Sequence, residues 1–97
     1  MLQNFEMAYK NYNKAIEYDP HDPEQYLNRA YVYEMWERYD EAIADYAESI
    51  RLDPNYDTAY NNRADLYNYL GEFEKAIQDC NATIALVDAE RKIKRKK

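Results

Sequence analysis

Glycine, proline and cysteine are scarce in this chain, whose 97 residues include one glycine, three prolines and one cysteine. Turn-rich β architectures depend on glycine and proline, so their scarcity favours long helices. One cysteine cannot close an intrachain disulfide or form a cysteine-based zinc site. No apolar run approaches the roughly 20 residues of a membrane span, and the first residues lack the basic-then-apolar order of a secretory signal. We therefore expect an all-α protein that is soluble and cytoplasmic.

Charge is distributed unevenly along the sequence. The formal net charge is −6, but six of the 13 basic residues lie in the last seven positions, Arg91–Lys97. Seven basic residues against 19 acidic ones remain in 1–90, a net charge of −12. Such an acidic body repels nucleic acid, so we expect nucleic-acid binding only through the basic tail. The alternative is that the tail is a solvated helix end, whose cations favour the helix dipole and need no partner.

The sequence repeats with a period of 34 residues, and 57–90 matches 23–56 at ten of 34 positions. The identical residues of the first copy recur 34 positions later, and they are Tyr26, Asn28, Arg29, Ala30, Tyr33, Ala42, Ile43, Asp45, Ile50 and Leu52. Two further series, which start at Ala8 and Ile16, run through a third, partial copy. Because the matches fall at the spacing of one helix face, they indicate a structural repeat.

Each copy is predicted to form two helices. In the first full copy we expect a helix from about Pro23 to Trp36, because Asp22 is a suitable N-cap and proline is tolerated in the first turn. A second helix should run from near Asp40 to Asp53, where Pro54 prevents its continuation.

The second copy repeats this scheme with two differences at its turns. Helices are expected from Asp57 to Leu70 and from Glu74 onward, and Gly71 between them permits a left-handed turn. The first copy has Glu37 instead of glycine, so its turn should be less relaxed. No proline follows Val87, so the last helix should continue toward Ile93. Residues 2–18 should form one more helix.

Small and charged residues at repeated positions predict how the helices pair. The alanines should let helices approach closely between large tyrosines. Arg29 and Arg63 could form ion pairs with Asp45 or Asp79 on the neighbouring helix, or they could capture a phosphate or carboxylate in a groove. Cys80 falls on the stripe of the last helix and is predicted to be a small core residue.

The period and these residue types resemble the tetratricopeptide repeat family. The matching positions are Tyr26, Ala30, Tyr33, Tyr39, Ala42, Tyr46, Leu52 and Pro54 in the first full copy, Tyr60, Ala64, Tyr67, Gly71, Phe73 and Ala76 in the second, and Phe5, Ala8, Tyr12 and Pro20 in the partial one. The resemblance implies an all-α, right-handed solenoid of helical hairpins, with five helices in about two and a half repeats. Residues 1–22 would be the second half of a repeat, 23–56 and 57–90 two full repeats, and 91–97 a basic tail that continues the last helix.

The resemblance also implies a function, because this family consists mostly of scaffolds that bind a peptide or protein segment. The first helices would line a concave face, and the candidate binding residues on them are Asn28, Tyr31, Met35, Asn62, Asp65 and Tyr69. Asparagine amides can pair with a peptide backbone, and the tyrosines and methionine can supply apolar walls. Acidic residues on the same helices favour basic or neutral peptides, and these are Glu24, Glu34 and Asp65.

One subset of the family holds the acidic C-terminal tails of heat-shock chaperones with a clamp of Lys, Asn, Asn, Lys and Arg. If Asn28 is aligned with the middle Asn, Thr58 and Asn62 stand where Lys and Arg are expected. If Asn62 is aligned there, Leu27 and Tyr31 stand where Lys and Asn are expected. Because the charge-assisted bonds of the clamp are lost, we do not expect that ligand.

The alternative function is structural self-assembly into a homodimer or a larger array through terminal helices that lack caps. Helix 2–18 is a second helix without the first helix that should cover it, so part of its apolar stripe is expected to be open. The candidate oligomer interface on this helix comprises Phe5, Tyr9, Tyr12 and Ile16. Repeat arrays usually need polar caps at their ends, and here only the C-terminal extension could serve as one.

Residues for catalysis are few. His21 is the only histidine and lies in a predicted turn, and Ser49 is the only serine and has no histidine in register for a catalytic triad. A single glycine excludes a glycine-rich phosphate loop. We therefore expect no enzyme activity, no cofactor and no metal.

Overall fold

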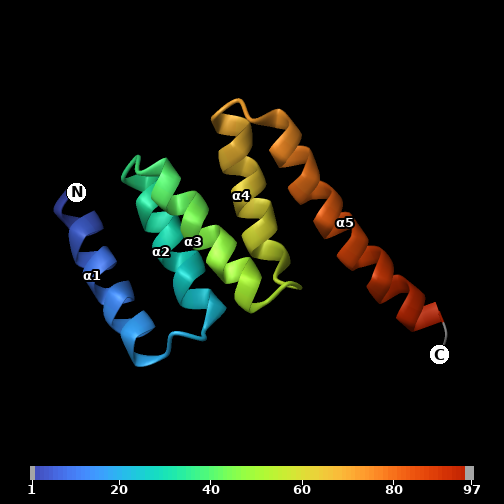
Figure 1. Ribbon diagram of the computed structural model, residues 1–97, viewed down its shortest axis with the longest axis horizontal. Coiled ribbons are helices and arrows are strands. Elements are labelled where there is room, and N and C mark those ends of the chain that lie inside the picture. The colour runs from blue at the N-terminus through green and yellow to red at the C-terminus, as the bar shows by residue number, and fades with distance from the viewer. Residues whose placement is uncertain (1, 96–97) are drawn as a thin grey trace. The chain divides into compact units, whose positions relative to one another are not determined.

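Residues 2–95 are described by the computed structural model, and they form helices joined by short turns (Figure 1). The helices are α1 (Leu2–Tyr18), α2 (Pro23–Met35), α3 (Tyr39–Leu52), α4 (Asp57–Tyr69) and α5 (Phe73–Arg95). Within the described residues there are five helices and no strand, so the predicted all-α class and the helix number are confirmed. Contacts divide the chain into an N-terminal unit, residues 1–54, and a C-terminal unit, residues 55–97.

The N-terminal unit is built around α2, which packs against both α1 and α3 (Figure 1). Its core contains Ala30 of α2 and Ala42 of α3, both 0% exposed. Beside them lie Tyr33 and Tyr46, whose rings are also buried. The small alanines allow the helix axes to approach, and the large rings fill the remaining space, as the sequence predicted.

The C-terminal unit is a hairpin of α4 and α5 that repeats this packing. Ala64 of α4 and Ala76 of α5 are buried at the positions equivalent to Ala30 and Ala42. Leu66, the counterpart of Val32, is only 1% exposed. The alternation of small and large residues therefore gives the same helix pairing in both copies.

The start of α2 has the predicted cap. The Asp22 side chain accepts a hydrogen bond from the Glu24 backbone N–H at 3.0 Å, and Pro23 occupies the first turn, where no backbone donor is needed. The hydroxyl of Ser49 donates to the Pro23 carbonyl at 2.8 Å, and this ties α3 to the start of α2. Ser49 is completely buried, so its role is structural.

Aromatic rings join α1 to α2. Tyr9 lies 5.5 Å from Tyr33 and 5.9 Å from Trp36 between ring centroids, and Phe5 lies 6.4 Å from Trp36. Burial and a hydrogen bond with Tyr9 raise the pKa of Tyr33 to about 12, because both favour the neutral phenol. Hydrogen bonds with Asn13 and Tyr33 lower the pKa of Tyr9. One side of the α1 stripe is thus covered by α2.

Helix α5 extends well beyond the start of α4 (Figure 1). It runs to Arg95 because Val87-Asp88 replaces the Asp-Pro that ends α3 at Asp53-Pro54. Val87 and Ile93 remain about half exposed or more, so the extension does not cap the hairpin. The end of the predicted basic tail, Lys96 and Lys97, lies outside the described residues.

The prediction that Cys80 belongs to the core is wrong, because the structure exposes it. Its counterpart in α3, Tyr46, is completely buried. Within the C-terminal unit, α4 covers only the Ala76–Asp79 side of α5, and no other helix of that unit covers the side that carries Cys80. A repeat pattern therefore predicts which face of a helix is suited to packing, but it does not predict whether another helix covers that face.

The turns after α2 and α4 share one geometry although their residues differ. Glu37 and Gly71 both have left-handed backbones, with φ of 61° and 80°. In both turns the next N–H bonds back across the helix end, from Arg38 to the Tyr33 carbonyl and from Glu72 to the Tyr67 carbonyl, each at 2.8 Å. A glutamate in this conformation has a steric cost that glycine avoids, as expected from the sequence.

Replacing Glu37 with glycine should therefore stabilise the protein by about 0.5–1 kcal/mol, since relief of the left-handed strain exceeds the added entropy of the unfolded chain. The reverse change, Gly71→Ala, should destabilise it by about 1 kcal/mol, although an added Cβ would have no neighbour within 4 Å. Urea denaturation followed by circular dichroism measures both. The control is Glu41→Gly in the exposed first turn of α3, which should destabilise; an equal loss for Glu37→Gly would contradict the proposed strain.

Candidate functional site

Three predicted binding residues of the N-terminal unit lie on one face of α2. Asn28, Tyr31 and Met35 are spaced three and four residues apart, on the side away from the buried Ala30 and Tyr33. Tyr31 is 54% exposed and Met35 is 44% exposed, whereas Asn28 is half-buried. Helix α2 therefore presents a polar amide beside two accessible apolar side chains.

Helix α4 presents a related group in the C-terminal unit. Asn62, Asp65 and Tyr69 have the same three-and-four spacing, and Asn62 is half-buried like Asn28. Asp65 is exposed, and the Tyr69 ring is 73% exposed. Each unit thus brings its three predicted residues together on a single helix face.

The amides of Asn28 and Asn62 have unused hydrogen-bonding capacity. Among the described residues, no side-chain hydrogen bond joins either amide to a partner, and neither amide is fully buried. Each amide has two donor hydrogens and an acceptor oxygen. Such groups, half-shielded from water beside apolar side chains, suit an extended peptide backbone.

The arginine next to each asparagine is held inside its hairpin. Arg29 of α2 donates two hydrogen bonds to the Asp45 carboxylate of α3, from Nε at 2.6 Å and from a terminal nitrogen at 2.8 Å. A third bond joins its other terminal nitrogen to the Asn13 side-chain oxygen of α1 at 2.7 Å. Asp45 is only 6% exposed, so the guanidinium is what satisfies this buried charge. Arg29 therefore links all three helices of its unit.

The C-terminal unit contains the equivalent pair. Arg63 of α4 donates to the two oxygens of Asp79 of α5 at 2.9 Å and 2.6 Å, and Asp79 is only 3% exposed. The hydrogen bond to the aspartate raises the pKa of each arginine above its already high value. Each guanidinium also lies within 6 Å of a tyrosine ring of its own helix, Tyr33 in one unit and Tyr67 in the other. Of the two interpretations of these arginines, the structural ion pair is confirmed.

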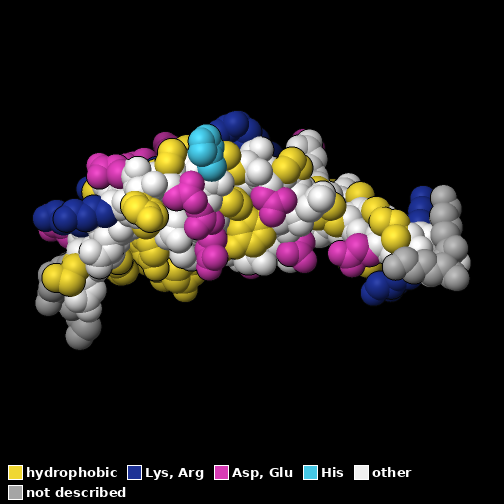
Figure 2. All heavy atoms as spheres, turned by 90° about the horizontal axis from the view of Figure 1, so that it is seen from below, with side chains coloured by type: hydrophobic (Ala, Val, Ile, Leu, Met, Phe, Trp, Pro, Cys, Tyr) yellow, Lys and Arg dark blue, Asp and Glu magenta, His cyan; other side chains and the backbone are white. Residues whose placement is uncertain are grey.

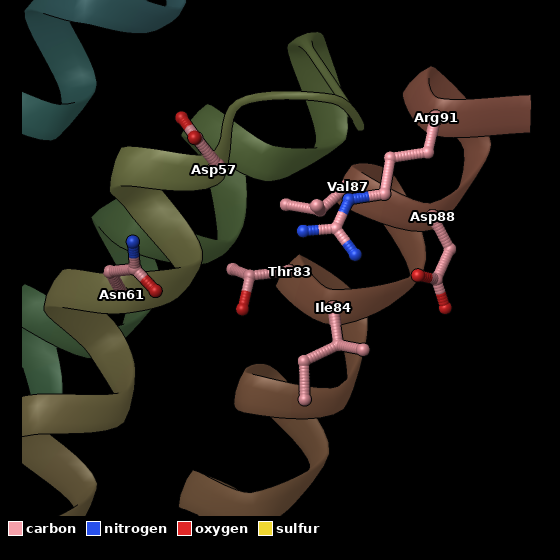
Figure 3. A pocket seen from close by; sticks show the side chains of 7 residues that line it. All are labelled: Asp57, Asn61, Thr83, Ile84, Val87, Asp88 and Arg91. Atoms are coloured by element: carbon pink, nitrogen blue, oxygen red, sulfur yellow. The ribbon is translucent and has the colours of Figure 1, made fainter. Parts of the chain in front are cut away.

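A shallow hollow of about 400 Å³ lies between the start of α4 and the second half of α5 (Figure 3). Its lining combines polar residues of α4 with apolar, polar and charged residues of α5, and these are Asp57, Asn61, Thr83, Ile84, Val87, Asp88 and Arg91. No pattern in the sequence predicted this hollow. The one signal that could have indicated it is the absence of a proline after Val87, because that absence allows α5 to continue past the start of α4.

Hydrophobic side chains are interspersed with acidic ones on the face of the molecule seen in Figure 2. The largest exposed apolar side chains of the C-terminal unit belong mainly to α5, and they are Phe73, Ile77, Ile84, Val87 and Ile93. Exposed apolar side chains that line up on one helix mark an interaction surface more strongly than scattered ones.

The two residues considered for catalysis, Ser49 and His21, both take part in local structural hydrogen bonds. The Ser49 hydroxyl is committed to the Pro23 carbonyl, and the His21 backbone N–H donates to Asp19 in an exposed turn. Residues 2–95 contain no group of three or more His, Cys, Asp or Glu side chains arranged to hold a metal ion. Among the helices formed by these residues, none is both long enough and apolar enough to span a membrane.

Three family models match the chain. Two described as tetratricopeptide repeat match residues 23–56 and 46–78, and one described as TPR repeat matches residues 2–35. A comparison with curated protein sequences gave no match.

Solved structures with this architecture include two that contain a peptide. The second TPR of Spaghetti (RPAP3), bound to the HSP90 peptide SRMEEVD, is 30% identical with a TM-score of 0.77, over 84% of this chain and 76% of that chain. The first TPR of the same protein, bound to the same peptide, is 25% identical with a TM-score of 0.79, over 97% of this chain and 80% of that chain. MamA is 21% identical with a TM-score of 0.86, over 95% of this chain and 54% of that chain, and shows similarity of fold alone.

Breaking one of the buried ion pairs should strongly destabilise the fold. Arg63→Met leaves Asp79 buried without its cation and should cost about 2–4 kcal/mol, because the exposed fractions of the two side chains are only 19% and 5%. The double variant Arg63→Met/Asp79→Leu should regain most of this loss, since neither charge remains. Urea denaturation measures the free energy of unfolding of the wild type and of both variants.

The matched control is Arg51→Met, which removes an arginine that is 66% exposed and paired with Glu48 on the same helix. It should cost less than about 1 kcal/mol. If Arg63→Met lowered the free energy of unfolding no more than Arg51→Met does, the ion pair between Arg63 and Asp79 would not be important for stability.

Proposed function

Because the chain belongs to the tetratricopeptide repeat family, we propose that it is a non-enzymatic scaffold that binds a segment of another protein on the exposed faces of α2 and α4. The observation that carries this proposal is the pair of half-buried amides, Asn28 and Asn62, which have no side-chain hydrogen-bond partner among the described residues. An extended peptide can satisfy such amides through its own backbone. The peptide-bound TPR domains of Spaghetti (RPAP3) support a peptide as the class of ligand.

Apolar anchors lie beside both amides. Tyr31 and Met35 follow Asn28 along α2, and Tyr69 follows Asn62 along α4, each with a large exposed surface. A tyrosine side chain buries a large area at little cost in conformational entropy, and a methionine side chain adapts its shape to its surroundings. Both properties suit the walls of a peptide site. The amides would hold the peptide through its backbone, and the fit of ligand side chains against these anchors would provide the specificity.

The ligand proposed for this chain is basic or neutral. Glu24 and Asp65 are exposed on the same helices, so the local charge is negative. The cations next to these asparagines in the sequence, Arg29 and Arg63, are held by buried aspartates, so they are not available to an acidic ligand. The peptide in the two RPAP3 structures, SRMEEVD, is acidic. An acidic peptide of that type would meet repulsion here.

Self-assembly through α1 stays a second prediction. Phe5, Tyr9, Tyr12 and Ile16 are all half-buried, and the rings of Phe5 and Tyr9 pack against α2. The side of α1 that faces away from α2 is the part that a partner would cover. Nucleic-acid binding by the basic tail likewise stays a prediction, as does a cytoplasmic location.

Peptides selected from a display library against the wild-type chain should carry no net negative charge, and the double variant Asn28→Ala/Asn62→Ala should bind them about tenfold more weakly, since each lost amide contact is worth about 0.5–1.5 kcal/mol. Isothermal titration calorimetry measures the affinities, with SRMEEVD as an acidic reference peptide that should bind more weakly than the selected ones.

The control is Asn11→Ala, an exposed asparagine on α1, which should leave the affinity unchanged. Unchanged affinity in the double variant would remove the amides from the site. Tight binding of SRMEEVD would overturn the proposed ligand charge.

A further inference from the structure

Helix α5 carries a continuous apolar stripe that nothing covers within the C-terminal unit. Its members are spaced four, three, four and three residues apart, and they are Phe73, Ile77, Cys80, Ile84 and Val87. All five are exposed, and each of the four large apolar side chains is about half exposed or more. This spacing is the one that places residues along the contact line of two packed helices.

Another helix of the same chain shows what such a stripe does when a partner is present. The positions 68 residues earlier are Phe5, Tyr9, Tyr12 and Ile16 of α1, so they are equivalent by two repeat periods. These residues are half-buried, and α2 packs against α1, where Phe5 contacts Trp36 and Tyr9 contacts both Tyr33 and Trp36. The exposed stripe of α5 is therefore a helix-packing surface without its helix.

We propose that this surface binds the same surface of a second copy, with the two α5 helices antiparallel and Cys80 near the twofold axis. The stripe is nearly symmetric about Cys80: Ile77 lies three residues before it and Ile84 four residues after it, and Phe73 and Val87 lie seven residues away on either side. In the antiparallel pair Ile77 faces Ile84 of the second copy. Phe73 faces Val87, so a large side chain meets a small one. A self-complementary patch of this kind is what an interface with twofold symmetry requires.

Charge also favours the antiparallel arrangement. The basic end of α5, which includes Arg91 and Lys92, would run past the turn between α4 and α5 of the second copy, where Glu72 and Glu74 are exposed. The same turn contains the C-terminal carbonyls of α4, which attract cations. Asp88 and Glu90 would both come near Glu72, and the four cations Arg91, Lys92, Lys94 and Arg95 on the same end of α5 offset that repulsion. A parallel pair would instead place the two basic ends side by side.

The hollow between α4 and α5 fits this arrangement. Ile84, Val87 and Arg91 line it from α5 (Figure 3). A phenylalanine side chain at position 73 of the second copy would lie opposite Val87, at the edge of the hollow. This proposal is independent of peptide binding by α2 and α4, because it uses a different helix face.

The first test is the oligomeric state of the 97-residue chain across a concentration series, measured by sedimentation equilibrium. One stripe makes a small interface, so we expect a dimer with a dissociation constant in the micromolar range or weaker. Ile77→Glu should raise this constant by at least about tenfold, since a carboxylate would be buried without a partner. The matched control is Met7→Glu on α1, another exposed apolar residue, which should leave dimerisation unchanged.

Circular dichroism of both variants should show unaltered helix content, because both positions are exposed. A monomer at every concentration would overturn the proposal. Dissociation by Met7→Glu without any effect of Ile77→Glu would also overturn it and would place self-association on α1.

The second test determines helix direction, using variants in which Cys80→Ser removes the only cysteine. Phe73→Cys and Val87→Cys chains are mixed and oxidised with diamide, which accepts the two protons and two electrons that a pair of thiols releases. The antiparallel pair should give mainly the mixed 73–87 disulfide, because those positions face each other. Predominance of the 73–73 and 87–87 disulfides would show a parallel pair and overturn the arrangement. With equal amounts of the two chains, random collision gives the 73–73, 73–87 and 87–87 disulfides in a ratio of 1:2:1, so a mixed fraction of only one half would also overturn it.

Discussion

In each hairpin of this protein a buried aspartate on the second helix holds an arginine of the first. Asp45 and Asp79 are almost fully buried, and a carboxylate in such a place is tolerable only if a cation and hydrogen bonds satisfy it. Arg29 and Arg63 provide both, through two nearly parallel bonds each. Because a bidentate pair has one productive geometry, it fixes which turn of one helix faces which turn of the other.

This constraint determines what the first helices can present to a ligand. Once Arg29 points at α3, its neighbour Asn28 is rotated by about a quarter-turn of the helix and lies on a different side. The same holds for Asn62 beside Arg63. The arginines therefore stabilise the hairpins, and the amides are the groups that we propose for recognition. A family scaffold without clamp cations can still bind a peptide backbone, but it loses the affinity for carboxylates that free guanidinium groups would give.

Much of the fold could be predicted from the sequence because the period and the helix ends are encoded locally. Asp22 and Pro23 begin α2, and Pro54 ends α3, through effects that involve only neighbouring residues. The expected helix boundaries are therefore correct to within one residue. The ion pairs were foreseen as one of two alternatives, since both partners recur at the same spacing. The burial of Ser49 and the exposure of Cys80 were not foreseen. Both depend on whether another element lies over the position, and a repeated pattern alone does not contain that information.

The contrast between α1 and α5 shows why this limit is physical. The two helices carry equivalent stripes, yet one is covered by α2 and the other lies open within its unit. Hydrophobic spacing makes a face suitable for packing, and the free energy of burial is gained from any complementary apolar surface. Which partner binds an open apolar face must instead be determined by the shape and charge of that face. On α5 the nearly symmetric spacing about Cys80 and the basic end of the helix provide both kinds of information, and for this reason we propose a second copy of the chain as the partner rather than an arbitrary helix.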